Sequence, residues 1–197
     1  TQRPGLATAA TWTIGVIGAM AAAAGFARYR TRQAERTFPP KGDFLEIEGV
    51  RLHYTVRGTG ETVVLLHGTG TMIEDFELSG LLELLASRYR VVAFDRPGFG
   101  HSTRPRGHLW TPAEQARLFL TAFQRLGVER PVVLCHSWGC LVGVEMGLQA
   151  PDTIRALVLV SGYFYPTLRL DVPMLSPPAL PVMGGAMRYT ISPLLGR

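Results

Sequence analysis

The sequence predicts an α/β fold with a mainly parallel sheet and helices on both faces. Two observations lead to this fold class. A hairpin pattern at residues 44–56 is followed by short, continuous apolar runs, as in strands buried on both faces. Segments with helical spacing alternate with those runs. In such a sheet, we expect the active site at the carboxyl ends of the parallel strands.

The strands are predicted from apolar patterns bounded by turn residues. Two alternating segments, 44–48 and 51–56, meet at Glu48-Gly49-Val50 and form the predicted hairpin. The buried strands are expected at residues 62–66, 90–94, 131–136 and 155–160.

The helices are predicted from leucine spacing and from capping residues. Leucines repeat at helical spacing over residues 78–86. Thr111, Pro112 and Glu114 have the spacing of an N-cap, a first helical residue and a capping-box partner, and Gly127 ends this helix. The next helix is expected over residues 139–149.

The charge distribution excludes some classes of partner. The chain has 197 residues, enough for one domain with a substantial core. Its formal charge of +5 lies in residues 1–41, whereas residues 42–197 hold 14 basic and 14 acidic side chains. We therefore expect no nucleic-acid partner. The sequence has no metal-ligand spacing, and we expect no metal, no cofactor and two reduced, packed thiols at Cys135 and Cys140.

The N-terminal segment is predicted to attach the protein to a membrane. Residues 4–27 carry no charged side chain, and four arginines follow between residues 28 and 36. A single-pass transmembrane helix within residues 1–27, followed by a basic, proline-containing linker at 28–43, is the favoured interpretation. A cleaved signal peptide, which would make the protein secreted or periplasmic, and an alanine-rich soluble helix are the alternatives. The orientation in the membrane stays open, because Arg3 opposes the arginines on the other flank.

Three motifs are expected at the carboxyl ends of neighbouring strands. They are HGTG at 67–70, DRPGFGHS at 95–102 and HSWG at 136–139. Ser137 lies where a strand must turn abruptly into a helix, and its neighbours Cys135 and Gly139 are small enough for close packing. At the start of that helix, the amide of Trp138 is free to bind an oxyanion, and we expect the amide of Thr69 to be the second donor.

Together these motifs resemble the α/β-hydrolase fold, and in particular its epoxide-hydrolase, haloperoxidase and esterase-like members. The resemblance covers residues 44–197 and implies that Ser137 is the nucleophile. It also implies that His67 and Gly68 shape the oxyanion loop and that Gly139 belongs to the nucleophile elbow. Asp95 and Arg96 are expected to fix the loop after their strand. Members that dehalogenate or open epoxides use an aspartate at the elbow, so Ser137 argues for acyl chemistry.

The rest of the catalytic triad is missing from the sequence. The family order is nucleophile, acid, histidine, but no histidine follows His136, and Glu145, Asp152 and Asp171 are weak candidates for the acid. We therefore expect a C-terminally truncated hydrolase with a core at 44–165 and the start of a lid at 166–197. A strand at 155–160 would then be a bare sheet edge.

The predicted function is that of a membrane-anchored serine hydrolase acting on an ester, thioester or related bond of a small apolar acyl substrate. The truncated chain itself is expected to be almost inactive. The alternative is a non-catalytic member that binds a small apolar ligand or a protein partner.

Overall fold

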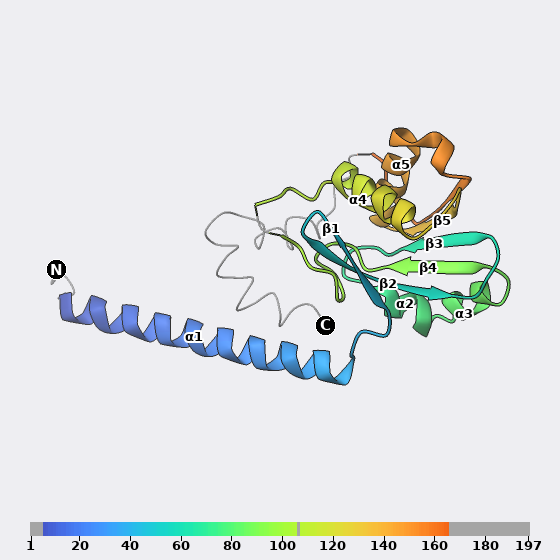
Figure 1. Cartoon of the computed structure of the whole chain (residues 1–197). Coiled ribbons are helices and arrows are strands. Elements are labelled where there is room, and N and C mark those ends of the chain that lie inside the picture. Colours follow the sequence, from blue (N-terminus) through green and yellow to red (C-terminus); the bar gives the residue numbers. More distant parts are fainter. Residues whose placement is uncertain (1–5, 106, 166–197) are drawn as a thin grey trace. The chain divides into compact units, whose positions relative to one another are not determined.

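A computed structural model describes residues 6–105 and 107–165 of the chain (Figure 1). The described residues belong to two units, which we treat separately. One contains the long helix α1 (Leu6–Thr37), and the other, Pro40–Tyr165, contains the sheet and the remaining helices.

The described part of the second unit is built on a six-stranded sheet with the order β1-β2-β4-β3-β5-β6. Strands β1 (Asp43–Ile47) and β2 (Val50–Arg57) form the predicted hairpin, and β2 also runs antiparallel to β4. The other strands are parallel to one another: β3 (Thr62–Leu66), β4 (Arg90–Phe94), β5 (Val132–His136) and β6 (Ala156–Val160). The mainly parallel sheet is therefore confirmed.

Helices cover both faces of this sheet, as predicted (Figure 1). Helices α4 (Pro112–Arg125) and α5 (Gly139–Gln149) pack on one face, where Phe119, Phe123 and Met146 are fully buried. The short helices α2 (Ile73–Leu78) and α3 (Leu81–Ala86) cover the other face, with Ile73 and Leu82 in its core. Each face of the central strands thus buries apolar side chains, which explains their continuous apolar sequences.

The register of the parallel strands brings the three sequence motifs together at the edge of the sheet where the carboxyl ends of these strands lie. Leu66, the last residue of β3, pairs with Phe94 at the end of β4 and with Cys135 near the end of β5. The loops that begin at His67, Asp95 and Ser137 therefore leave the sheet side by side.

The helices predicted at 78–86 and after Thr111 have different outcomes in the structure. Of the predicted helix at 78–86, residues 81–86 form α3, which begins only after Gly80 with its left-handed φ of +73°, and α2 (73–78) was not predicted. Helix α4 begins as predicted, since the Thr111 hydroxyl accepts a hydrogen bond from the Glu114 amide at 3.2 Å.

Helix α1 continues without a break through the arginine-rich segment to Thr37, so most of the predicted linker is helical. Among the residues that the structure describes, no helix is both long and apolar enough to cross a bilayer. The prediction of a transmembrane helix is therefore not confirmed. Eleven of the residues 8–27 are alanine or glycine, whose side chains contribute little apolar area.

Strand β6 lies at one edge of the sheet and pairs only with β5 within the described part of the chain. Its apolar side chains are partly exposed, with Val158 and Val160 each at 42%. The predicted lid at 166–197 and the candidate acid Asp171 lie outside the described residues. The truncation stays a prediction.

Candidate active site

Ser137 lies on the sharp turn between β5 and α5. Its backbone has the left-handed φ of +51°, which is rare for a residue other than glycine. The Ser137 amide donates to the Val160 carbonyl at 2.9 Å, and the Ser137 carbonyl accepts from the Cys140 amide at 3.0 Å. Hydrogen bonds to the neighbouring strand and within the new helix thus hold the turn. They offset the left-handed backbone of Ser137, which costs on the order of 1–3 kcal/mol.

Close packing around this turn explains its small residues. A Cβ atom at Gly139 would lie 2.7 Å from the His67 carbonyl oxygen and 2.8 Å from that of Leu66. Cys135 lies against Gly143, where an added Cβ would be 2.5 Å from the sulfur. The start of α5 therefore touches the end of β3, and only glycine fits at position 139.

Both cysteines are buried free thiols, as predicted. Burial raises the pKa of each, so they remain protonated at neutral pH. The Cys140 thiol donates to the Cys135 carbonyl at 3.2 Å. These side chains pack the elbow and do not act as nucleophiles.

The loop after β3 lies against Ser137. A Cβ atom at Gly68 would lie 2.9 Å from the Ser137 Cβ and 3.4 Å from its Oγ. The amides of Thr69 and Trp138, the two expected oxyanion donors, give no hydrogen bond to another described residue. Within the described part of the chain, neither amide therefore has a hydrogen-bond acceptor.

His67 is buried and engaged through both ring nitrogens. Its Nδ1 donates to the Gly68 carbonyl at 2.8 Å, and its Nε2 accepts from the Arg96 amide at 2.9 Å. Burial and the Arg96 cation lower the pKa of His67 to about 4. His67 is thus a neutral ring that connects the loop after β3 with the Arg96 amide.

Asp95 anchors three segments. Its carboxylate accepts hydrogen bonds from His53 Nδ1 at 2.7 Å and from the amides of Ile73 and His101, each at 2.9 Å. Burial opposes ionisation, but these hydrogen bonds outweigh it, and the pKa of Asp95 lies below its usual value. Asp95 therefore connects the loop after β4 with His53 and with the start of α2.

Arg96, which together with Asp95 was expected to fix the loop after β4, has contacts that the sequence did not reveal. Its side chain is only 1% exposed, and it contacts the loops after β3 and β5. Its place directly after the buried strand β4 indicated a role in the loop, but arginine is so rarely buried that its full burial was not expected.

No described histidine hydrogen-bonds to Ser137, although all five histidines of the chain are described. His53 is bound to Asp95, His108 pairs with Glu114 at the surface, and the ring of His101 contacts that of His53. The His136 ring lies beside Gly68 without a hydrogen bond to Ser137.

The carboxylates that follow Ser137 also lie elsewhere. Glu145 lies on α5 beside Gln149, and Asp152 lies in the short 3₁₀ helix Pro151–Thr153 beyond the far end of α5. Residues 6–105 and 107–165 thus place Ser137 beside Gly68 and directly before Trp138, without a hydrogen-bonded base.

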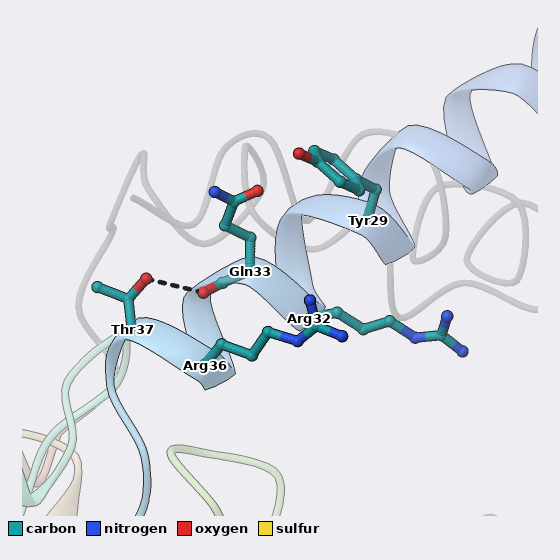
Figure 2. Close-up of a pocket in the computed structure, with 5 residues that line it drawn as sticks. All are labelled: Tyr29, Arg32, Gln33, Arg36 and Thr37. Atoms are coloured by element: carbon teal, nitrogen blue, oxygen red, sulfur yellow. Dashed lines mark hydrogen bonds between the residues drawn. The ribbon is translucent and has the colours of Figure 1, made fainter.

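Other surface features of the described residues do not compete with this edge as a catalytic site. One pocket on α1 is lined by Tyr29, Arg32, Gln33, Arg36 and Thr37 (Figure 2). Another is lined by Glu61, Thr62, Glu129, Arg130 and Arg155, near the amino-terminal ends of the parallel strands. Neither contains a nucleophile paired with a base, and the described residues hold no cluster of metal-ligating side chains.

Comparison with known proteins agrees with the fold. A haloalkane dehalogenase 2 of Mycobacterium tuberculosis is 30% identical over 129 residues, which cover 66% of this chain and 44% of that protein. An acetyltransferase component of the acetoin cleaving system of Cupriavidus necator is 34% identical over 119 residues, which cover 60% of this chain and 31% of that protein. The crystal structure of epoxide hydrolase VrEH1 from Vigna radiata superposes with a TM-score of 0.58 and 28% identity, over 69% of this chain and 45% of that one.

The chain thus spans less than half the length of these relatives. The sequence profile of the α/β hydrolase fold family matches residues 61–185, which include all three motifs of the candidate site. This chain belongs to the α/β hydrolase fold family.

Proposed function

We propose that this protein is a serine hydrolase that cleaves an ester, thioester or related acyl bond. The observation that carries the proposal is the position of Ser137 on a left-handed elbow beside the unoccupied amides of Thr69 and Trp138. A hydroxyl nucleophile beside two amide donors suits a reaction whose transition state carries an oxyanion.

Two of the relatives are named as a haloalkane dehalogenase and an epoxide hydrolase. The residue at the elbow separates the proposed reaction from the reactions that these names state. A carboxylate that attacks the carbon of a haloalkane or an epoxide forms an ester, which water can then hydrolyse. A serine hydroxyl would form an ether with the same carbon, and water would not release it. Ser137 therefore supports turnover of carbonyl substrates and opposes turnover of haloalkanes or epoxides.

In the proposed reaction, the Ser137 oxygen attacks the carbonyl carbon of the substrate. The oxyanion of the tetrahedral intermediate accepts hydrogen bonds from the amides of Thr69 and Trp138. The intermediate then expels the alcohol or thiol and leaves an acyl group on Ser137. A water molecule attacks this acyl group, a carboxylic acid departs, and the Ser137 hydroxyl is restored.

A general base must take the proton of Ser137 and pass it to the leaving group. The five histidines are engaged elsewhere or do not bond to Ser137, so we propose that none of them is the base of the triad. A chain limited to these 197 residues should then hydrolyse esters very slowly.

The proposed substrate is a small apolar acyl compound, and its hydrolysis needs no cofactor. Its support is the apolar surface next to the elbow. Trp138 is half-buried directly after Ser137, and Phe164 is 47% exposed close to Gly162, which packs against Cys140.

The second candidate function is binding without catalysis. The observation that favours it is that Ser137 has no hydrogen-bonded base in the described part of the chain. In that case, the edge of the sheet would hold an apolar ligand without cleaving it.

Hydrolysis of short-chain nitrophenyl esters by the complete gene product tests the proposal. Ser137→Ala should reduce kcat by at least about 10³-fold, since the nucleophile is lost. Ser161→Ala is the matched control, because Ser161 directly follows β6 with a similar φ of +52°, and this variant should keep its activity. Equal activity of wild type and Ser137→Ala would overturn the proposal, and ester binding without turnover would favour the second candidate.

We also propose that α1 binds an anionic membrane surface. Arg28, Arg32 and Arg36 recur every four residues and therefore lie along one side of the helix. Tyr29 is 60% exposed on the same part of the helix as Arg32 and Arg36 (Figure 2). Arginines beside exposed aromatic rings suit the boundary between lipid headgroups and acyl chains.

A further inference from the structure

We infer that Arg96 is the positioning residue of the oxyanion hole, because one guanidinium fixes both loops that carry the proposed donor amides. The inference rests on the proposed function and deepens it. It goes beyond the role expected of Arg96 from the sequence, which was to fix the loop after β4 together with Asp95, since it assigns to Arg96 a direct influence on transition-state binding.

The contacts of Arg96 converge on the loop after β3. Its Nη2 donates to the Gly68 carbonyl at 2.7 Å, and its Nε donates to the His67 carbonyl at 2.8 Å. Its Nη1 donates to Oε1 of Gln115, a buried residue of α4, at 3.3 Å. The planar guanidinium therefore grips two successive carbonyls while α4 holds its other end.

The first of these hydrogen bonds determines where the Thr69 amide points. The Gly68 carbonyl and the Thr69 N–H belong to the same planar trans peptide group and point in opposite directions. Holding the Gly68 oxygen toward Arg96 turns the Thr69 N–H away from it. The Gly68 carbonyl accepts a second hydrogen bond from His67 Nδ1, so this peptide group is held from two directions.

The same side chain also contacts the residue that carries the other donor. The Arg96 guanidinium carbon lies 4.4 Å from the centroid of the Trp138 ring and 4.6 Å from that of Phe99. Cation–π contacts of this length stabilise a buried cation and limit the movement of the ring. Arg96 thus connects the loop of Thr69 with the first residue after Ser137.

The charge of Arg96 adds to this geometry. Arg96 forms no salt bridge with a carboxylate among the described residues, since Asp95 is turned toward His53. Burial lowers the pKa of Arg96 to about 10, so the side chain remains a cation at neutral pH. A buried positive charge without a carboxylate partner strengthens the binding of negative charge that develops nearby.

A role confined to folding would have different consequences from this positioning role. If Arg96 only stabilises the loop, variants should be less stable, or a smaller fraction of the molecules should be active. If Arg96 orients the donors, folded variants should lose kcat while KM stays nearly constant, because substrate in the ground state has not yet formed the oxyanion.

The test uses Arg96→Lys and Arg96→Gln in the complete gene product, with active sites counted by fluorophosphonate titration. Lysine keeps the charge but cannot grip both carbonyls, so we expect kcat per active site to fall by about 10-fold, with KM within about 3-fold of wild type. Glutamine also removes the charge, and we expect a loss of about 10²- to 10³-fold. Arg104→Lys, at an exposed arginine of the same loop, is the matched control and should leave kcat unchanged.

A pair of inhibitors provides a second readout. A trifluoromethyl ketone forms a tetrahedral oxyanion with Ser137, whereas the matching ester-like ether binds without reacting. Arg96→Lys should weaken the binding of the ketone in proportion to the loss of kcat/KM in this variant. The binding of the ether should be unaffected. Unchanged kcat per active site, or equal weakening of both inhibitors, would overturn the inference.

These outcomes separate the inference from the proposed function. If Ser137→Ala keeps its esterase activity, the proposed function fails whatever Arg96 does. If Ser137→Ala is inactive and Arg96→Lys matches wild type, only the role of Arg96 fails. Should Arg96→Gln not fold, Arg96→Lys and the inhibitor pair still decide the question.

Discussion

At the scale of single residues, His67 and Asp95 show how hydrogen bonding decides the role of a titratable side chain. Both are residue types that a catalytic triad uses, and both lie at strand ends close to the elbow. However, His67 uses its two ring nitrogens within the loop, and Asp95 accepts three hydrogen bonds from other segments. Their partners leave neither free to act on Ser137.

The low pKa of His67 predicts a specific loss of stability in acid. The folded pKa is about 4 and the unfolded value is 6.5, so the unfolded chain binds more protons between these two values. The contribution is fully present above pH 6.5 and is lost as the pH falls toward 4. One pKa unit corresponds to about 1.4 kcal/mol, so the total loss is about 3 kcal/mol.

Urea unfolding at several pH values measures this contribution. The free energy of unfolding of wild type should fall more steeply from pH 6.5 to 4 than that of His67→Asn, which has no group to titrate at this position. Parallel slopes for wild type and His67→Asn would contradict the assignment.

Some residues of the site were predictable from the sequence and others were not. Ser137 was recognisable because it stands between a strand pattern and a helix pattern with small neighbours at positions 135 and 139. A loop-fixing role of Arg96 was also expected, but its burial was not, because that depends on carbonyls of another loop and on a ring of a third, which no local pattern reveals. The roles of Ser137, Thr69 and Trp138 in catalysis remain predictions.

At the scale of elements, the contact between α5 and β3 determines whether the elbow can form. The first residue of α5, Gly139, lies against the carbonyl oxygens of Leu66 and His67. These are backbone atoms, which cannot move aside as the end of a flexible side chain can. The helix can therefore start directly after Ser137 only if its first residue has no side chain.

Gly139→Ala should accordingly destabilise the protein. The added methyl group must displace β3 or α5, and we expect a loss of about 2–3 kcal/mol in the free energy of unfolding, together with loss of esterase activity. Gly147→Ala in the same helix is the matched control, because its methyl group would meet only the end of the Leu157 side chain, at 3.3 Å.

In the control variant, the better helix propensity of alanine should keep stability within about 1 kcal/mol of wild type. Thermal unfolding of both variants measures the difference. A Gly139→Ala protein as stable as Gly147→Ala would show that the contact is looser than described.

The elements themselves were largely predictable, and the exceptions have clear causes. The strands were evident because parallel strands covered on both faces need continuous apolar sequences. The break between α2 and α3 was missed because the leucine spacing continues across Gly80, whose left-handed backbone interrupts the helix. The arginine-rich segment was expected to be a linker, yet its residues have good helix propensity and extend α1 to Thr37.

At the scale of the whole molecule, the two units suggest separate tasks for attachment and chemistry. Positive charge is concentrated in residues 1–41, whereas residues 42–197 are electrically balanced. A surface interaction of α1 with anionic lipid would use this charge and leave the catalytic unit unaffected. The interaction should weaken with salt, because exposed charges are screened beyond about 10 Å at 0.1 M.

Co-sedimentation with vesicles tests the proposed membrane interaction. The protein should pellet with vesicles that contain phosphatidylserine and much less with vesicles of phosphatidylcholine alone. Replacing Arg28, Arg32 and Arg36 by glutamine should weaken binding by about 10²-fold, at about 1 kcal/mol per arginine. The same change at exposed arginines of the second unit, Arg88, Arg104 and Arg117, removes equal charge and should have little effect.

Two results would contradict this account of α1. One is equal binding to both kinds of vesicle, and the other is equal loss of binding in the two triple variants. Retention in the pellet after a high-salt wash would instead indicate insertion into the apolar layer.

The central claim is that Ser137 is a nucleophile for acyl chemistry, and covalent labelling of the complete gene product tests it most directly. A fluorophosphonate should add one mass increment, which peptide mapping should place on Ser137. The increment should be absent from Ser137→Ala and present in Ser161→Ala. A label on another residue, or no label on a folded protein that has its complete sequence, would contradict the claim.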